Sequence, residues 1–118
     1  MNDCFVSAVE DERNKELLVV RSRVRGDLER VIPGCKVFTT PTRDYLFRTF
    51  IEKEKFAKIV SDRVLAIDYG NFKDTIEKSD TERSHAYMGV WTKMFYFQEN
   101  VHGDEYQTNW QNYRYYKK

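Results

Sequence analysis

The sequence is poor in the residues that bind metals or form nucleophilic sites. Its 118 residues include two cysteines, Cys4 and Cys35, and two histidines. The two cysteines are too far apart in the chain to form a CxxC pair, so neither a zinc nor an iron–sulfur site is expected. We predict no metal and no cofactor. We also expect both cysteines to be free thiols, as in an intracellular protein.

The signatures of common hydrolases and transferases are also missing. The chain has no G-x-S-x-G, G-x-x-x-x-G-K-[ST], H-E-x-x-H or G-x-G-x-x-G motif. One alternative is a phosphodiesterase that uses His85 and His102 with Lys73 as acid and base. Seventeen residues of helix would separate the histidines by roughly 25 Å, which is too far for joint action. We therefore predict a protein that is not an enzyme.

Neither a surplus of charge nor a long hydrophobic run is present. Twenty Lys and Arg residues nearly balance nineteen Asp and Glu residues, giving a net charge of +1. This balance argues against a broadly basic nucleic-acid binder, so we expect no DNA partner. No apolar run reaches the ~18–20 residues that cross a bilayer, and the N-terminus is acidic where a signal peptide is basic. We expect a cytoplasmic protein without a membrane partner.

The residues that are present predict a folded α+β domain. Hydrophobic residues make up 41% of the chain and aromatic residues 15%, which is unlike a disordered chain. Apolar periodicity and turn residues predict strands at 5–9, 17–20, 36–40 and 45–51 and helices at 22–32, 53–67 and 79–98. We expect the first two strands to form a hairpin and the last two to pair antiparallel. The order β-β-α-β-β-α-α predicts an antiparallel four-stranded sheet with helices packed on one face. We expect one domain over residues 1–100 and an aromatic-rich tail over 101–118.

The helical periods also predict which side chains face the sheet. The residues expected to be largely buried are Val24, Leu28, Phe56, Val60, Val64, Val90 and Met94. The tail has a different composition, with aromatic residues among Gln, Asn and Lys. It is equally consistent with an unpacked terminus and with a segment that docks on a partner or on the domain.

Arginines near the first predicted helix indicate an anion site. Arg21, Arg23 and Arg25 precede or open that helix, where the helix dipole disfavours cations by ~0.3–1 kcal/mol each. A bound phosphate or carboxylate would compensate for this. The alternative is a salt-bridged solvent-exposed stripe. Arg48, which shares a face of the fourth predicted strand with Leu46 and Phe50, and Arg43 in the preceding turn add two candidate anion contacts.

A second candidate region is the loop at residues 68–73. Gly70 and Asn71 suit a tight turn, while Tyr69 and Phe72 lie beside Lys73. Aromatic side chains in such a loop can stack on a base, which is worth ~1–3 kcal/mol. Packing of both rings into the domain core is an equally good interpretation.

Several strings together resemble a family of short bacterial and phage-encoded proteins. They are VRSRVRGDLERV at 20–31, Thr40-Pro41 with Asp44-Tyr45 and Phe47-Arg48, IDYGNFK at 67–73, and His85-Ala86-Tyr87 with Val90-Trp91. They span roughly residues 5–98 and leave the tail outside. The family is identified here with the phage Thoeris anti-defence proteins. Those are non-enzymatic sponges that sequester cyclic ADP-ribose signals and, in some members, cyclic oligonucleotides.

The resemblance implies a cyclic nucleotide signalling molecule as ligand. We also expect a homo-oligomer, because a small α+β domain can enlarge a shallow site by sharing it across a two-fold interface. Arginines would hold the phosphates and aromatic rings the base or ribose. The candidate ligand-binding residues are Arg21, Arg23, Arg25, Arg43, Arg48, Tyr69, Asn71, Phe72, Lys73 and Tyr87. The alternative is a small protein–protein inhibitor, similar to an anti-CRISPR, that docks through the third helix or the aromatic tail.

Overall fold

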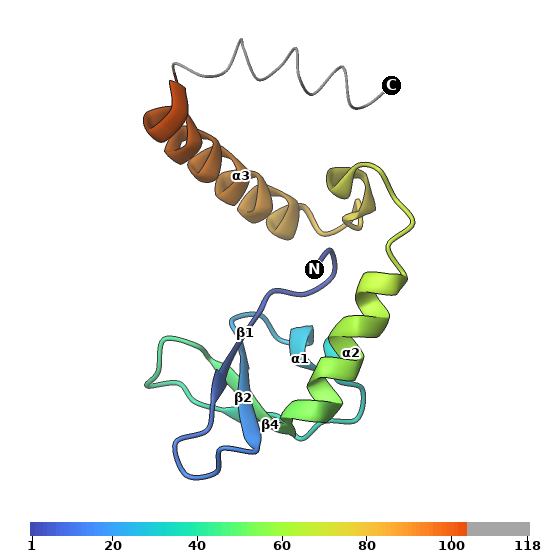
Figure 1. Cartoon of the computed structure of the whole chain (residues 1–118), viewed down its shortest axis with the longest axis vertical. Helices are drawn as coiled ribbons and strands as arrows, with labels where there is room; N and C mark the ends of the chain where they lie inside the picture. Colours follow the sequence, from blue (N-terminus) through green and yellow to red (C-terminus); the bar gives the residue numbers. More distant parts are fainter. Residues whose placement is uncertain (104–118) are drawn as a thin grey trace. The chain divides into compact units, whose positions relative to one another are not determined.

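The computed structural model describes residues 1–103 and divides the chain into two compact units, 1–76 and 77–118 (Figure 1). The first unit contains β1 (Val6–Glu10), β2 (Leu17–Ser22), α1 (Asp27–Val31), β3 (Phe38–Thr39), β4 (Phe47–Glu52), α2 (Lys53–Leu65) and the 3-10 helix η1 (Phe72–Thr75). The described part of the second unit contains α3 (Thr81–His102). The expected domain of residues 1–100 spans both units and stays a prediction.

The four strands form one antiparallel sheet, which confirms the predicted α+β class. Their order is β1-β2-β4-β3, so β2 and β4 are the central strands. The predicted pairing of β1 with β2 and of β3 with β4 is confirmed, while the pairing of β2 with β4 was not predicted. Its register places Val20 opposite Thr49 and Ser22 opposite Phe47. Paired residues point to the same face of a sheet, so these four side chains share one face.

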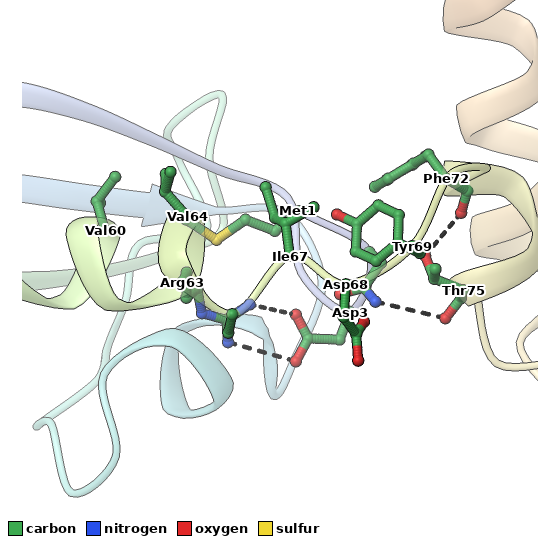
Figure 2. Close-up of a pocket in the computed structure, with 12 residues that line it drawn as sticks. Met1, Asp3, Val60, Arg63, Val64, Ile67, Asp68, Tyr69, Phe72 and Thr75 are labelled. Carbon is green, nitrogen blue, oxygen red and sulfur yellow. Dashed lines mark hydrogen bonds and ion pairs between the residues drawn. The ribbon is translucent and has the colours of Figure 1, made fainter.

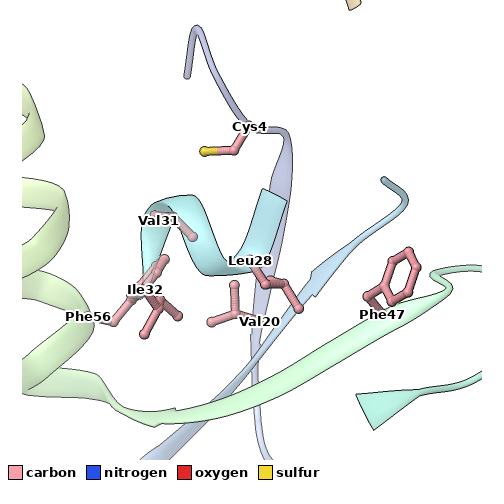
Figure 3. Close-up of a cluster of buried hydrophobic side chains, with 7 residues drawn as sticks. All are labelled: Cys4, Val20, Leu28, Val31, Ile32, Phe47 and Phe56. Atoms are coloured by element: carbon pink, nitrogen blue, oxygen red, sulfur yellow. The ribbon is translucent and has the colours of Figure 1, made fainter. Parts of the chain in front are cut away.

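The core of the first unit lies on this face, under α1 and α2 (Figure 3). Val20 from β2 and Phe47 from β4 pack with Leu28 and Val31 of α1 and with Phe56 of α2. Leu28 and Phe56 are therefore buried as predicted, whereas Val60 is only partly buried. The helices of this unit cover one face of the sheet and leave the other open.

Helix α1 is much shorter than predicted, because the chain turns sharply before it. Gly26 has a φ of +96°, in the left-handed region, and this conformation prevents a continuous helix from residue 22 to residue 32. Asp27 then starts the helix with a fully buried carboxylate, which accepts hydrogen bonds from the Phe5 amide at 2.9 Å and from Arg30 at 2.8 Å. Val24 lies before this turn and is 50% exposed, so its predicted burial is wrong.

Three other burial predictions are also wrong. Val64 is 58% exposed near the end of α2, because only the first half of that helix packs on the sheet through Phe56. Val90 and Met94 of α3 are 53% and 57% exposed. They belong to the second unit, in which α3 is the one described helix, and a single helix cannot bury its own apolar side chains.

The ends of α3 also differ from the prediction. Asp80 caps the helix by accepting a hydrogen bond from the Arg83 amide at 3.1 Å, and the helix continues to His102 instead of ending near Gln98. His102, expected beyond the helix, is therefore its last residue. The aromatic tail of the prediction lies almost entirely outside the described residues.

Two further expectations concern the thiols and the membrane. Neither Cys4 nor Cys35 forms a disulfide bond, as predicted. Within residues 1–103, no helix has the length and apolar character needed to cross a bilayer.

Candidate anion-binding face of the sheet

The open face of the sheet carries a row of polar and aromatic side chains across all four strands. Ser7 of β1 is paired with Arg21 of β2, Arg21 with Arg48 of β4, and Arg48 with Phe38 of β3. Arg21 and Arg48 are thus direct cross-strand neighbours of like charge, about 5 Å apart at Cα. Like charges in this position destabilise a sheet unless something compensates for them.

Tyr45 gathers two of the arginines just before β4. The Arg23 guanidinium lies 4.1 Å from the centroid of the Tyr45 ring, and the Arg21 guanidinium lies 4.6 Å from it. Arginine stacks well on aromatic faces because its charge is delocalised and weakly hydrated. Stacking holds both cations in place and still leaves N–H groups of each guanidinium available for an acceptor.

One carboxylate, that of Asp44, is paired with these arginines among the described residues. It lies 3.4 Å from Arg48, and its side chain is 67% exposed. Arg23 donates to the Asp44 backbone carbonyl at 2.8 Å, which brings no negative charge. Three guanidinium groups therefore face one exposed carboxylate, and the local balance is positive although the whole chain is nearly neutral.

The hydrogen bonds of Arg21 leave one donor unused. Its terminal nitrogen donates to the Ser7 hydroxyl at 2.8 Å. Its Nε atom is buried and has no partner. An unsatisfied buried donor costs about 1–3 kcal/mol, so an acceptor that reached this atom would be stabilised.

An exposed aromatic pair lies next to the arginines. The rings of Phe38 and Phe50 meet edge to face with centroids 5.8 Å apart, and the residues are 41% and 48% exposed. Phe38 is the cross-strand partner of Arg48, and Phe50 lies two residues along the same strand, as the sequence predicted for the shared face. We call the surface of Arg21, Arg23, Arg48, Tyr45, Phe38 and Phe50 the open sheet face.

The other two predicted arginines, Arg25 and Arg43, do not belong to the open sheet face. The Arg25 guanidinium is 5.0 Å from the ring of Phe47, and Arg25 itself is exposed. Arg43 is exposed in the turn between β3 and β4, where its amide donates to the Thr40 carbonyl at 3.0 Å. The prediction that Arg21, Arg23 and Arg25 precede or open a helix is wrong, because α1 begins only at Asp27.

The predicted loop lies in a different place, at a pocket of about 630 Å³ beside the end of α2 (Figure 2). Tyr69 and Phe72 line it, with ring centroids 6.2 Å apart, so they do not plug the sheet core. Asn71 accepts a hydrogen bond from the Lys73 amide at 3.0 Å and caps η1, which is a structural role. None of the predicted cations lines this pocket.

The arginine that does line the pocket is already neutralised. Arg63 donates to both carboxylate oxygens of Asp3, at 2.8 and 3.3 Å, and to the Arg30 carbonyl at 3.0 Å. This pairing holds the pKa of Asp3 below its usual value, mainly through the hydrogen bond from Arg63. Asp68 adds a second carboxylate to the lining. The pocket is therefore a poor place for a phosphate.

Tyr87, predicted as a base or ribose contact, belongs to the second unit. Its hydroxyl accepts a hydrogen bond from Arg83 of the same helix at 3.2 Å. His85 and His102 both lie on α3, so about 25 Å of helix separates them. Within residues 1–103, no group of three His, Cys, Asp or Glu residues could hold a metal ion.

Sequence reasoning missed half of the open sheet face. Tyr45, Phe38 and Phe50 were not among the predicted contacts, although all three belong to predicted strands. Alternation along the fourth predicted strand does place Phe50 on the same face as Arg48. The cross-strand neighbours Arg21 and Phe38 required the register, which the sequence did not supply.

Comparisons with known proteins add no relative: no family model, curated protein or solved structure matches the chain. The resemblance to the anti-defence proteins therefore stays a prediction.

Proposed function

We propose that this protein is a non-enzymatic binding protein that sequesters a cyclic nucleotide, and that the phosphates of that ligand bind at the open sheet face. The observation that carries the proposal is the direct opposition of Arg21 and Arg48 on neighbouring strands. Arg23 lies beside them, and within residues 1–103 Asp44 is the one carboxylate paired with them. A phosphate between the guanidinium groups would relieve their repulsion and add charge-assisted hydrogen bonds.

The aromatic pair supplies the second half of a nucleotide site. A base stacked on Phe50 or Phe38 would lie next to a phosphate on Arg48, because a strand repeat of two residues spans about 7 Å. Cyclic ADP-ribose isomers and cyclic oligonucleotides both combine phosphates with bases at such short separation. The family resemblance names the same ligands, and it enters here only as support for which ligands to test.

The absence of turnover is the third part of the proposal. The open sheet face contains guanidinium groups and aromatic rings, and Asp44, the carboxylate beside it, is paired with Arg48. Tyr69, Asn71, Phe72, Lys73 and Tyr87 have no part in the phosphate contacts proposed here.

Calorimetry with purified full-length protein tests the proposal. We expect binding of at least one cyclic ADP-ribose isomer or cyclic dinucleotide, weakening with added salt, and release of the intact ligand on heating. Arg48→Gln and Arg21→Gln should each weaken binding about tenfold or more, which corresponds to ~1.4 kcal/mol. Phe50→Ala should weaken it by the ~1–3 kcal/mol of a lost stack.

The matched control is Arg13→Gln, which removes an exposed arginine from the loop between β1 and β2. It should leave affinity unchanged. The melting temperature of the ligand-free protein is a second test. Arg48→Gln should leave it unchanged or raise it, because the substitution removes the positive charge opposite Arg21. Equal affinity of Arg13→Gln and Arg48→Gln would refute the site, and product formation would refute sequestration. Capture of a protein target without nucleotide binding would favour the inhibitor interpretation.

A further inference from the structure

Helix α3 carries an apolar surface that the function proposed above does not use. The residues Val90, Met94, Phe97 and Val101 follow one another at intervals of four, three and four residues, and each is more than half exposed. Tyr87 continues the series three residues earlier. This spacing keeps the side chains on one line of a helix and is typical of helices that pack against another helix.

A second apolar line runs beside the first. Met88, Trp91 and Phe95 are 45%, 52% and 41% exposed, and the rings of Trp91 and Phe95 stack with centroids 5.5 Å apart. At 100° per residue the two lines together cover about half of the helix circumference. Glu82, His85, Thr92, Lys93 and Glu99 occupy the other half. We call the two lines the α3 apolar face.

We propose that the α3 apolar face is the contact of a homodimer, in which α3 packs antiparallel against α3 of a second copy of this chain. An isolated helix of the length of α3, 22 residues, is marginally stable in water and gains its stability from packing. A second copy offers an identical line of knobs at the same spacing, so the contact can close on itself with two-fold symmetry.

The order of side-chain sizes favours the antiparallel arrangement. With the two-fold axis near Thr92, Val90 faces Met94 of the copy, and Tyr87 faces Phe97 of the copy. Aliphatic layers thus lie at the centre, with aromatic layers outside them. A parallel pair would bring the two Arg83 side chains into one layer, whereas the antiparallel pair places each Arg83 opposite Val101 of the copy and opposes the helix dipoles.

The size of the surface is sufficient for a dimer. Seven exposed side chains that each bury roughly 80–100 Å² would remove ~600 Å² of surface per copy and ~1,200 Å² for the pair, which is the lower end of stable interfaces.

The residues on the polar side of α3 argue against binding of this helix to a membrane surface. Interfacial helices are rich in Lys and Arg there, whereas Glu82 and Glu99 offset Lys93 on this helix.

Sedimentation equilibrium or light scattering of the full chain tests the dimer. We expect a mass near twice 14.2 kDa at micromolar concentration. Phe97→Glu should give the monomer mass, because it buries a charge in the contact. The matched control is Tyr96→Glu, which changes a similarly exposed aromatic residue outside the α3 apolar face, about 100° around the helix from Phe97, and should stay dimeric. Circular dichroism would verify that both variants keep their helix content.

Cross-linking tests the direction of the helices. A mixture of Val90→Cys and Met94→Cys chains should form a disulfide between the two variants much faster than either variant does alone, with the native chain as the background for Cys4 and Cys35. A monomeric native chain, or a Phe97→Glu variant that stays dimeric, overturns the proposal. Faster self-coupling of Val90→Cys overturns the antiparallel arrangement, and a monomer that binds anionic vesicles assigns the face to a membrane surface. None of these results depends on nucleotide binding.

Discussion

The two faces of the sheet use the same strands for opposite purposes. On the covered face, Val20, Ser22, Phe47 and Thr49 are each at most 4% exposed and pack under α1 and α2. On the open face, their immediate neighbours include arginines of like charge and half-exposed phenylalanines. Alternation along a strand separates the two roles by a single residue. Stability can therefore be concentrated on one side, which leaves the other side free to carry an arrangement that is unfavourable without a ligand.

The largest expected effect is the loss of packing on the covered face. Leu28→Ala removes a fully buried side chain and should lower the free energy of unfolding by ~2–5 kcal/mol. Phe50→Ala on the open face should cost less than about 1 kcal/mol. Urea denaturation followed by circular dichroism measures both. Similar losses would break the distinction between the faces.

Thiol labelling measures how tightly the covered side is closed. Cys4 is fully buried, and its burial raises the pKa of the thiol to about 11, whereas Cys35 is partly exposed. Burial raises the pKa of Cys35 as well. Because the thiolate is the reactive form, we expect Cys35 to be alkylated about tenfold faster or more at pH 8. Mass spectrometry of a time course gives both rates, and equal rates would indicate that the N-terminal segment opens readily.

The ion pair between Asp3 and Arg63 should make stability depend on pH. The pKa of Asp3 is lowered in the folded protein, so the pair stabilises the fold above the unfolded value of 3.8, and this contribution is lost as the pH falls through the folded-state pKa. The pair is partly exposed, so we expect at most ~1 kcal/mol. Asp3→Asn should be less stable at pH 7 and lose less on acidification. Asp62→Asn, which breaks an exposed pair on α2, is the control for denaturation at pH 7 and pH 3.

The smallest expected effect sharpens the role of charge on the open face. Asp44→Asn removes the carboxylate that competes for Arg48 but keeps an oxygen that can accept the hydrogen bond from the Tyr45 amide. We expect pyrophosphate to bind ~2–5-fold more tightly, in line with the ~0.2–1 kcal/mol of an exposed ion pair. Calorimetry measures the change. Weaker binding would mean that Asp44 positions the arginines instead of competing with the ligand.

Prediction from the sequence succeeded where a signal lies within one segment. The β1–β2 and β3–β4 pairings, α2 and the presence of α3 each follow from local periodicity and turn residues, although Asp80 caps α3 and the helix extends to His102. The predicted bounds of the first helix were wrong, because Gly26 adopts a left-handed conformation that the neighbouring residues in the sequence do not indicate. The predicted burial of Val64, Val90 and Met94 was wrong. Periodicity shows which side of a helix is apolar, but it does not show whether another element covers that side.

In the candidate site, too, local features follow from the sequence and long-range features do not. The sequence alone determined that arginines are concentrated around two strands and that Arg48 and Phe50 share a face, since strand alternation is a local property. Only the tertiary structure decided that Arg21 lies opposite Arg48, that Tyr45 holds two arginines, and that the loop of Tyr69 and Phe72 lines a separate pocket. Those relations join residues more than twenty positions apart. They depend on the register of β2 against β4 and on where α2 ends, which are set by the packing of the whole core.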